Sequence, residues 1–298
     1  MIPIDTPRGE FRVWTRRTGN NPRVKVLLLH GGPGATHEYF AACDSYFPAA
    51  EIEYYSYDQL GSAWSDQPDA PDLWTIPRFV DEVEQVREAL GLDHDNFYLL
   101  GHSWGGMLAI EYALEHQRHL KGLVISNMMS SGPAYNAYTE SVLMPAMDQD
   151  VLAEIKHLEA TEATDDPRYM ALLMEHHYVH HILRMPAEAW PDPVNRTFAS
   201  INPAIYVPLQ GPSELGAGGV LRTWDRTADL PEITVPTLVI GARYDTMDPN
   251  YMKMMAGKFP RGTYLFCPNG SHMAMYDDQV TYFNGLIDFI RRVDVSAA

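Results

Sequence analysis

The feature of this chain that most constrains its fold is a serine set between glycines at a strand-to-helix junction. Residues 101–105 read Gly-His-Ser-Trp-Gly. The apolar residues 97–100 before them are typical of a buried strand, and residues 106–114 after them carry apolar side chains at helical spacing. A serine on such a sharp turn has an accessible hydroxyl, and the N-terminus of the following helix stabilises negative charge beside it. The pattern predicts a nucleophile elbow in which Ser103 is the attacking residue.

An earlier glycine-rich loop is expected to stabilise the oxyanion that forms when this serine attacks a carbonyl. Residues 24–29 are an apolar run of the parallel-strand type, and residues 30–34 read His-Gly-Gly-Pro-Gly. The proline has no N–H, so hydrogen-bond donors must come from the glycines. We expect the backbone amides of Gly32 and Trp104 to form an oxyanion hole, and Gly31 to contact the substrate. The alternative is a glycine-rich turn without a chemical role.

An acid and a base follow in the order that an α/β hydrolase requires. Residues 237–241 are typical of a strand, and Asp245 lies in the loop after it. Asp248 is the competing carboxylate, although an aspartate before a proline and a helical stretch is also a common N-cap. Residues 263–267 predict a last strand, and His272 lies in the glycine-containing loop that follows. Because the order serine, aspartate, histidine is that of α/β hydrolases, we expect Asp245 and His272 to complete a catalytic triad with the elbow serine.

The spacing of the expected strands and helices indicates the fold class and its division. Strands and helices alternate up to about residue 127. The alternation then stops through a stretch rich in Met, His, Pro and aromatic residues, and resumes from residue 230. This order predicts an α/β-hydrolase fold, a mostly parallel sheet flanked by helices, with an inserted, mainly helical cap. We expect residues 1–127 and 230–298 to form the two parts of the core, and residues 128–229 to form the cap over the active site.

Composition narrows the classes of partner. The chain has 39 Asp and Glu against 22 Lys and Arg, a net charge of −17 over 298 residues. Such an acidic chain is a poor partner for nucleic acid or an anionic membrane, and it mildly favours cationic substrates. No apolar run approaches the ~20 residues of a membrane span, and the first residues lack the pattern of a signal peptide. With only Cys43 and Cys267, no disulfide framework is expected, and a cytoplasmic enzyme is the simplest interpretation.

Four motifs together resemble those of the proline iminopeptidase family. They lie at residues 30–34 (His-Gly-Gly-Pro-Gly), 58–62 (Asp-Gln-Leu-Gly-Ser), 101–106 (Gly-His-Ser-Trp-Gly-Gly) and 270–272 (Gly-Ser-His). The resemblance covers the core at about residues 10–126 and 230–290 and, more weakly, the cap. It implies a serine aminopeptidase that releases an N-terminal residue, often proline, or an amino-acid amidase, acting on a small peptide or amide. Considered alone, the segment at 58–62 ends a strand and either lines the site or forms a capped turn.

Within the cap, one short segment resembles the part of that family that recognises the substrate's amine. Residues 211–215 read Gly-Pro-Ser-Glu-Leu, and the resemblance implies that Glu214 binds the free amino group of the substrate. The family is also described as placing a second acidic residue directly after the triad aspartate. This chain has Thr246 there, which leaves room for amide or other acyl substrates.

Two other classes of protein remain open at this point. An esterase or lactonase uses the same fold and triad, whereas epoxide hydrolases and dehalogenases use an aspartate where this chain has Ser103. Glu214 discriminates between an aminopeptidase and an esterase, because an ester site has no use for a buried carboxylate aimed at an amine. A non-catalytic ligand-binding relative usually lacks part of the triad, and this chain has all three members.

The cap also holds histidines at i, i+4 spacing, a geometry that is compatible with metal binding: His176, His177, His180 and His181. No set of the His-Glu-x-x-His type accompanies them, and a serine triad needs no metal. We therefore expect an ordinary cap helix with polar and stacking histidines, and neither a metal nor another cofactor.

Overall fold

The computed structural model describes residues 1–296, and its centre is a seven-stranded sheet. β3 pairs antiparallel with β5, and every other neighbouring pair in the sheet is parallel. The mostly parallel, helix-flanked sheet expected from the sequence is confirmed. A separate hairpin of β1 (Ile2–Thr6) and β2 (Gly9–Val13) precedes it. In spatial order the sheet contains β3 (Thr15–Thr18), β5 (Glu53–Tyr57), β4 (Lys25–Leu29), β6 (Phe97–His102), β7 (Gly122–Ser126), β8 (Thr237–Ala242) and β9 (Gly262–Cys267).

The central strands are buried on both faces, because helices cover each side of the sheet. Alternate residues of one strand therefore belong to different hydrophobic cores. Leu27 and Leu29 of β4 pack into one core, and Val26 and Leu28 pack into the other. The near-continuous apolar run at this strand is the sequence pattern of a parallel strand covered on both sides.

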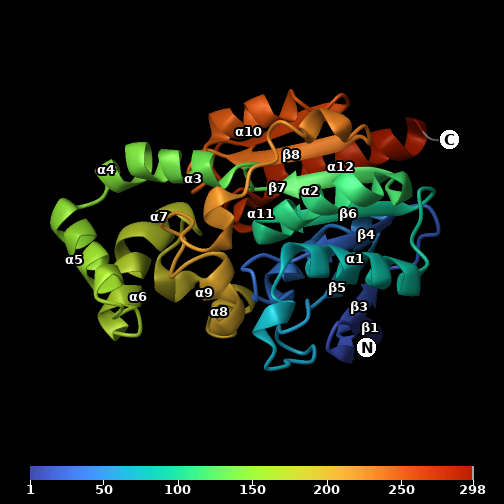
Figure 1. The fold of residues 1–298 in the computed structure, drawn as a ribbon. Helices are drawn as coiled ribbons and strands as arrows, with labels where there is room; N and C mark the ends of the chain where they lie inside the picture. The colour runs from blue at the N-terminus through green and yellow to red at the C-terminus, as the bar shows by residue number, and fades with distance from the viewer. Residues whose placement is uncertain (297–298) are drawn as a thin grey trace.

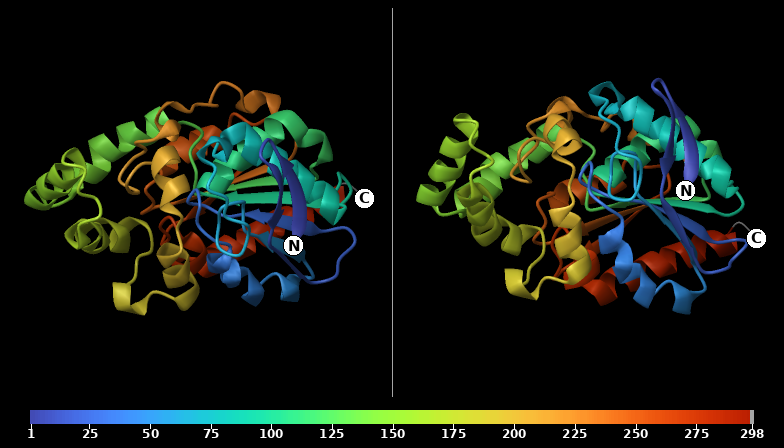
Figure 2. Two further views of the ribbon diagram at one scale, coloured as in Figure 1. Left: turned by 60° about the horizontal axis from the view of Figure 1, so that its bottom comes forward. Right: turned by 90° about the horizontal axis from the view of Figure 1, so that it is seen from below.

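The helices form two layers around the sheet (Figures 1 and 2). The first core is closed by α1 (Ile76–Leu90), α2 (Trp104–His116) and α10 (Pro249–Ala256). The second is closed by the 3-10 helix η1 (Glu38–Ser45) and by α12 (Gln279–Ser296), which follows the short α11 (Ala274–Asp277). Within residues 1–296, every helix is too short or too polar to span a bilayer.

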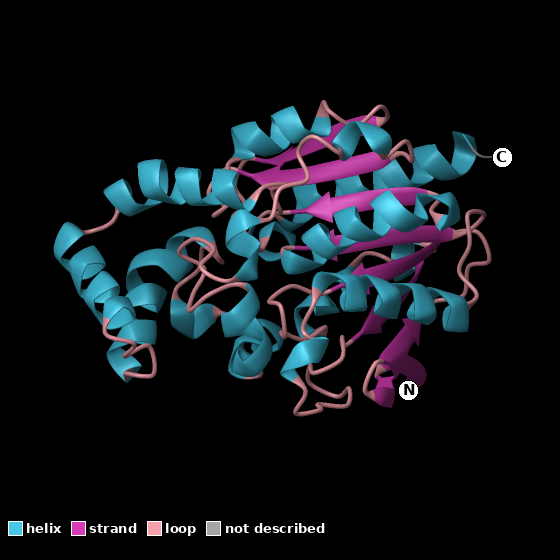
Figure 3. Cartoon of the chain, in the orientation of Figure 1, coloured by secondary structure: helices cyan, strands magenta, loops and turns pink. Residues whose placement is uncertain are grey.

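The chain between β7 and β8 forms a helical layer beside the ends of the parallel strands (Figure 3). The structure describes all of this stretch, and it contains no strand. It consists of α3 (Gly132–Tyr138), the π-helix η5 (Thr139–Leu143), α4 (Met144–Ala146), α5 (Gln149–Ala160), α6 (Pro167–Leu173), the π-helix η6 (Met174–Tyr178), α7 (Val179–His181), α8 (Asp192–Ala199), α9 (Pro203–Leu209) and short 3-10 turns. We keep residues 128–229 as the proposed bounds of the cap.

Candidate active site

Ser103 lies on a strained turn between β6 and α2. Its φ of 55° and ψ of −129° are unusual for a residue with a side chain, and strain of this kind persists where the surroundings hold it. Two glycines allow the turn to pack closely. A Cβ on Gly101 would lie 1.9 Å from the carbonyl oxygen of Gly105, and a Cβ on Gly105 would lie 2.0 Å from that of Leu29. The Gly-x-Ser-x-Gly pattern thus has a steric cause at both of its glycines.

Asp245 and His272 meet because β8 and β9 are parallel neighbours whose carboxyl ends lie at the same edge of the sheet. Nδ1 of His272 is 2.7 Å from Oδ1 of Asp245. Asp248, the competing carboxylate, instead accepts a hydrogen bond from the backbone N–H of Asn250 and caps α10. The structure therefore brings Asp245 to His272 and directs Asp248 to a helix end.

The hydrogen bonds around Asp245 determine the tautomer of His272. An ionised carboxylate only accepts hydrogen bonds, so Nδ1 of His272 carries a proton and Nε2 remains free to accept one. Asp245 also accepts from the backbone N–H of Met247 at 3.1 Å and from the side-chain amide of Asn127 at 2.7 Å. The hydroxyl of Thr246 lies 3.3 Å from the same carboxylate. The acid is thus held by donors from three further residues.

Asn127 is a residue of the site that the sequence analysis missed. It follows β7 directly, is fully buried and has a φ of 53°. Its amide donates to Asp245 and to the backbone carbonyl of Ser271, at 2.7 and 3.2 Å. Its only sequence signal is an amide residue at the carboxyl end of a buried strand, the edge where ligands bind in open α/β sheets.

His272 is buried beside two acidic side chains, which set its titration. Burial lowers the pKa of His272, but the charge of Asp245, its hydrogen bond and the charge of Glu214 raise it more. The net effect is a pKa above the ordinary histidine value. The protonated ring is therefore well stabilised in this site.

The oxyanion loop approaches the serine at its first glycine. A Cβ on Gly31 would lie 2.9 Å from Cβ of Ser103. The amide of Gly31 is already used, since it donates to the hydroxyl of Tyr39 at 2.7 Å. Gly32 has a φ of 108°, and a Cβ there would lie 2.6 Å from the backbone nitrogen of Ala35. This leaves Gly32 as the neighbouring glycine amide, beside the unpaired first N–H of α2.

The segment at 58–62 supports the oxyanion loop without lining the catalytic cavity. The side chain of Gln59 donates to the backbone carbonyl of His30 at 2.9 Å and accepts from the indole N–H of Trp104 at 2.9 Å. The backbone N–H of Gln59 donates to Nε2 of His30 at 3.0 Å. Burial lowers the pKa of His30 to about 4, so this ring stays neutral. The sequence suggested that this segment lines the site or forms a capped turn, and neither suggestion includes its support of the oxyanion loop.

A second unexpected link joins the oxyanion loop to the base. Nε2 of His102 lies 2.8 Å from the backbone carbonyl of His272, so this nitrogen carries the proton. Nδ1 of His102 accepts from the hydroxyl of Tyr39 at 3.0 Å, and that hydroxyl accepts from the amide of Gly31. Burial lowers the pKa of His102 to about 3. The relay is thus neutral and fixes the oxyanion loop relative to the His272 loop.

Glu214 points into the same cavity as Ser103 and His272. Its carboxylate accepts from the hydroxyl of Tyr206 at 2.5 Å, and its backbone carbonyl accepts from that of Tyr135 at 2.7 Å. Within residues 1–296, no lysine or arginine pairs with this carboxylate. Burial and, less strongly, the charge of Asp245 raise the pKa of Glu214 more than the charge of His272 and the Tyr206 hydrogen bond lower it. The site therefore holds a desolvated carboxylate without a full cationic partner.

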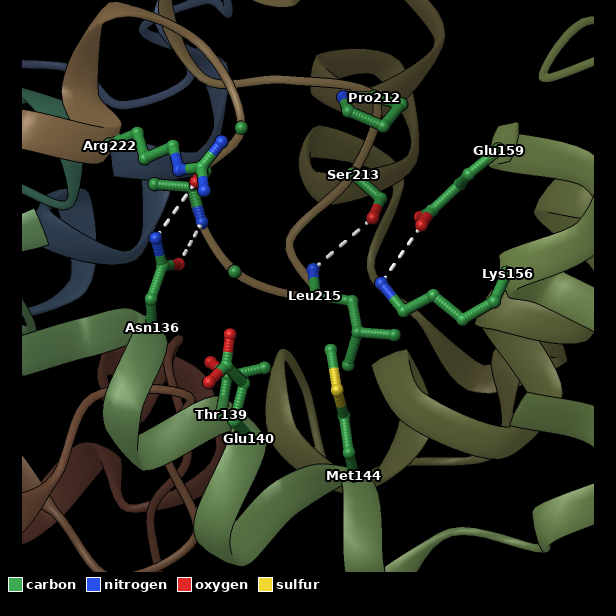
Figure 4. A pocket seen from close by; sticks show the side chains of 13 residues that line it. Asn136, Thr139, Glu140, Met144, Lys156, Glu159, Pro212, Ser213, Leu215 and Arg222 are labelled. Atoms are coloured by element: carbon green, nitrogen blue, oxygen red, sulfur yellow. Dashed lines mark hydrogen bonds and ion pairs between the residues drawn. The ribbon is translucent and has the colours of Figure 1, made fainter. Parts of the chain in front are cut away.

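The segment that carries Glu214 is held from its outer side (Figure 4). There, a polar pocket of about 180 Å³ is lined by Ser213 and Leu215, the neighbours of Glu214 in the chain. The side chain of Asn136 donates to the backbone carbonyl of Ala217 at 3.0 Å and accepts from its N–H at 2.7 Å. These contacts fix the loop, so α3 helps to position Glu214 within the cap.

The four histidines at residues 176–181 of the cap differ in burial: His177 is buried, His176 and His181 are half-buried, and His180 is exposed. The segment is π-helical in η6 and α-helical in α7, so a regular helix with i, i+4 spacing does not form. The ring centroids of His177 and His181 lie 5.2 Å apart with the rings tilted by 44°, and the two rings face the backbone carbonyls of Glu214 and Tyr244. The carbonyl of His181 accepts the N–H of His272 at 2.9 Å. Among the described residues, these histidines do not form a group that could hold a metal ion.

Comparisons with known proteins agree with this fold. Residues 25–279 match the family described as the alpha/beta hydrolase fold. A proline iminopeptidase from Flavobacterium johnsoniae is 54% identical over 294 residues, which cover 99% of this chain and 98% of that protein. The solved structure of VinJ has a TM-score of 0.90 at 32% identity and covers 98% of each chain. A proline iminopeptidase structure from Mycobacterium smegmatis has a TM-score of 0.84 at 28% identity, covering 99% of this chain and 100% of that chain.

The fold and the arrangement around the elbow define a serine hydrolase of the α/β-hydrolase class. Within that class, the chain belongs to the proline iminopeptidase family, which comprises serine aminopeptidases.

Proposed function

We propose that this protein releases the first residue of small peptides, or of amino-acid amides, by acyl transfer to Ser103. The observation that supports this best is the buried Glu214 carboxylate in the same cavity as Ser103 and His272. A desolvated carboxylate without a cation is costly unless a charged group binds to it. The ammonium of a free N-terminus is such a group, and an acidic chain with a net charge of −17 attracts it.

The roles of the residues follow from their geometry. Nε2 of His272 takes the proton of Ser103 as the hydroxyl attacks the carbonyl carbon, and Asp245 stabilises the imidazolium that forms. The amides of Gly32 and Trp104 donate to the oxyanion, a contribution of about 3 kcal/mol for one such donor. The imidazolium then protonates the departing amine, and water releases the bound acyl group with His272 again acting as the base.

A second, partly enclosed cavity of about 10 Å³ lies beside Ser103, and we propose that a small apolar first residue enters here. Its walls come from the elbow, the first and last parts of the cap and the loop after β8, and they are formed by Ser103, Trp104, Met128, Gly132, Tyr135, Gln210, Glu214, Ala217, Leu221, Trp224 and Met247. Because Glu214 is the only charged residue among these, we assign this cavity to the side chain of the first residue and propose proline as a preferred one, as the names of the relatives suggest.

A hydrolysis panel tests the proposal. It contains prolyl, alanyl and leucyl arylamides, the corresponding amides, and N-acetylated versions of each arylamide. We expect the free-amine substrates to be cleaved and the acetylated ones to be cleaved far more slowly, because acetylation removes the positive charge. If the wild type cleaves acetylated substrates as fast as free ones, Glu214 does not bind an amine, and the esterase alternative is favoured.

Glu214→Gln should lower kcat/KM for aminoacyl arylamides by about tenfold or more, since a charge-assisted hydrogen bond contributes about 1.5–3 kcal/mol. Above the acid limb of the pH profile, turnover of nitrophenyl acetate should stay nearly unchanged, because that ester has no ammonium. Glu159→Gln is the matched control: this cap glutamate also accepts from a tyrosine hydroxyl, that of Tyr169 at 2.9 Å, but it lies on the outer pocket. Equal losses on both substrates would contradict the assigned role.

The acid limb of the pH profile should lie above the ordinary histidine range. His272 must be neutral to act as a base, and its raised pKa means that activity is lost at a higher pH than about 6.5 as the solution is acidified. Because the charge of Glu214 contributes to this raised pKa, Glu214→Gln should move the limb to lower pH. Nitrophenyl acetate is the substrate to use, since it does not titrate. A limb that moves to higher pH would contradict this coupling.

Partners and location follow the same reasoning. The net charge of −17 supports a protein without nucleic-acid or anionic-membrane partners. A cytoplasmic location remains our proposal, and it rests on cysteine usage: Cys43 and Cys267 are both buried and free.

A further inference from the structure

The direction of proton delivery decides on which side of Ser103 the leaving group lies. His272 protonates the departing amine, so that amine must lie next to the histidine. Ser103 lines two cavities, and His272 lines only one of them, the catalytic cavity that also contains Gly31 and Gly32. If the proposed function is correct, the part of the substrate after the scissile bond extends into that cavity.

The catalytic cavity adjoins a much larger groove in the cap. The cavity has a volume of about 40 Å³ and the groove one of about 540 Å³, and Phe198 and Ile201 line both. The walls of the groove come from α6, η6, α8 and α9. A peptide that continues beyond the scissile bond does not fit within the small cavity, and the groove is the adjoining space that is large enough.

The groove is apolar and has no cation to bind a carboxylate. Met170 and Val207 line it and are 43% and 47% exposed, which is unusual for large apolar side chains that lie together. Asp165 is the one charged residue among those that line it within residues 1–296. The chemistry therefore fits an apolar peptide segment better than a free C-terminal carboxylate.

The wall of this groove also contacts the amine-binding residue. Tyr206 and Tyr178 both line the groove. The hydroxyl of Tyr206 donates to the carboxylate of Glu214 at 2.5 Å, and that of Tyr178 accepts the backbone N–H of Glu214 at 3.2 Å. The residue proposed to hold the substrate ammonium is therefore hydrogen-bonded to two tyrosines of the groove wall.

We propose that this cap groove binds the residues after the scissile bond, and that it selects peptides whose second residue is apolar. The inference rests on the proposed function and names the second half of its substrate. Met170 and Val207 are the exposed side chains that such a residue would cover.

Two dipeptide amides that share their first residue and carry leucine or glycine second test the groove. The first residue is that of the amino-acid amide that the wild type hydrolyses fastest. We expect kcat/KM for the leucine peptide to exceed that for the glycine peptide about tenfold or more, as burial of a leucine side chain allows. The double variant Met170→Gln/Val207→Gln should lower this ratio roughly threefold or more, because it makes the groove polar.

The ratio of two substrates on one enzyme does not depend on the fraction of active protein, so a partly unfolded variant still gives a valid result. Met254→Gln is the matched control. Met254 is 41% exposed and lies on α10, outside the cap, so this variant should keep the wild-type ratio. A wild-type ratio near one, or a ratio that the double variant leaves unchanged, overturns the proposal that the groove binds the second residue. The amino-acid amide has no second side chain, so failure of the wild type to hydrolyse both this amide and the two dipeptide amides contradicts the proposed function instead.

Discussion

Replacing Ser103 by alanine is expected to lower kcat/KM for aminoacyl arylamides by roughly 10⁵-fold or more. The hydroxyl is the attacking group, and without it only the oxyanion hole and substrate binding promote the reaction. Alanine keeps the Cβ, so the backbone can retain its φ of 55° and the melting temperature should change little. A catalytic loss in a folded protein is therefore the expected phenotype.

Probe labelling and the turnover of further variants distinguish loss of the nucleophile from loss of the fold. A fluorophosphonate probe should label the wild type and not Ser103→Ala, whereas Ser141→Ala, an exposed cap serine, should behave as the wild type. His272→Ala and the double variant should lose about as much turnover as Ser103→Ala alone, because the two residues act as one unit. If Ser103→Ala kept turnover close to that of the wild type, Ser103 would not be the nucleophile.

The parts of the site that the sequence predicts are those whose geometry is set within a few residues. The elbow needs a strand, two glycines and a helix start, all between residues 97 and 106, and its steric causes are local except for the approach of Leu29. The cap of α10 is equally local, since Asp248 accepts from the N–H two residues later. Such patterns can be interpreted without knowing the fold.

The bracing residues could not be predicted because their partners are distant in the chain. Asn127 contacts Asp245 across 118 positions, and His102 contacts the His272 carbonyl across 170. Tyr39 joins this network only because η1 packs on the same face of the sheet. Buried polar side chains of this kind have no periodicity, so their roles appear only in the folded chain.

The edge strand of the sheet and the path of the chain through the cap also could not be predicted from the sequence. β3 is the polar run Thr-Arg-Arg-Thr, which lacks apolar alternation because an edge strand is paired on one side only. The π-helical turns of the cap replace the regular helix that the histidine spacing suggests. Glu214 was identified by family resemblance, and its direction depends on contacts with Tyr135 and Tyr178 from other helices.

Asp245→Asn is expected to lower turnover by roughly 10⁴-fold. Oδ1 of Asp245 accepts from His272 at 2.7 Å and from the Met247 N–H at 3.1 Å, and Oδ2 accepts from the Asn127 amide at 2.7 Å. An asparagine must point its NH₂ group at one set of these donors. Pointed at His272, it forces the other tautomer, so Nε2 carries the proton and cannot accept that of Ser103. Pointed at Asn127, it sets two NH₂ groups against each other in a buried site.

Asn127 cannot relieve this conflict by turning its own amide, because its Oδ1 accepts from the hydroxyl of Ser126 at 2.9 Å and its NH₂ group also donates to the Ser271 carbonyl. Asp248→Asn is the matched control for Asp245→Asn. It makes the same chemical change in the same loop, and asparagine caps a helix about as well as aspartate, so both turnover and melting temperature should stay near those of the wild type. Steady-state kinetics on one arylamide, measured above the acid limb of the pH profile, compare the two variants. A reversal of the two phenotypes would make Asp248 the triad acid, and unchanged turnover in both would mean that neither carboxylate orients His272.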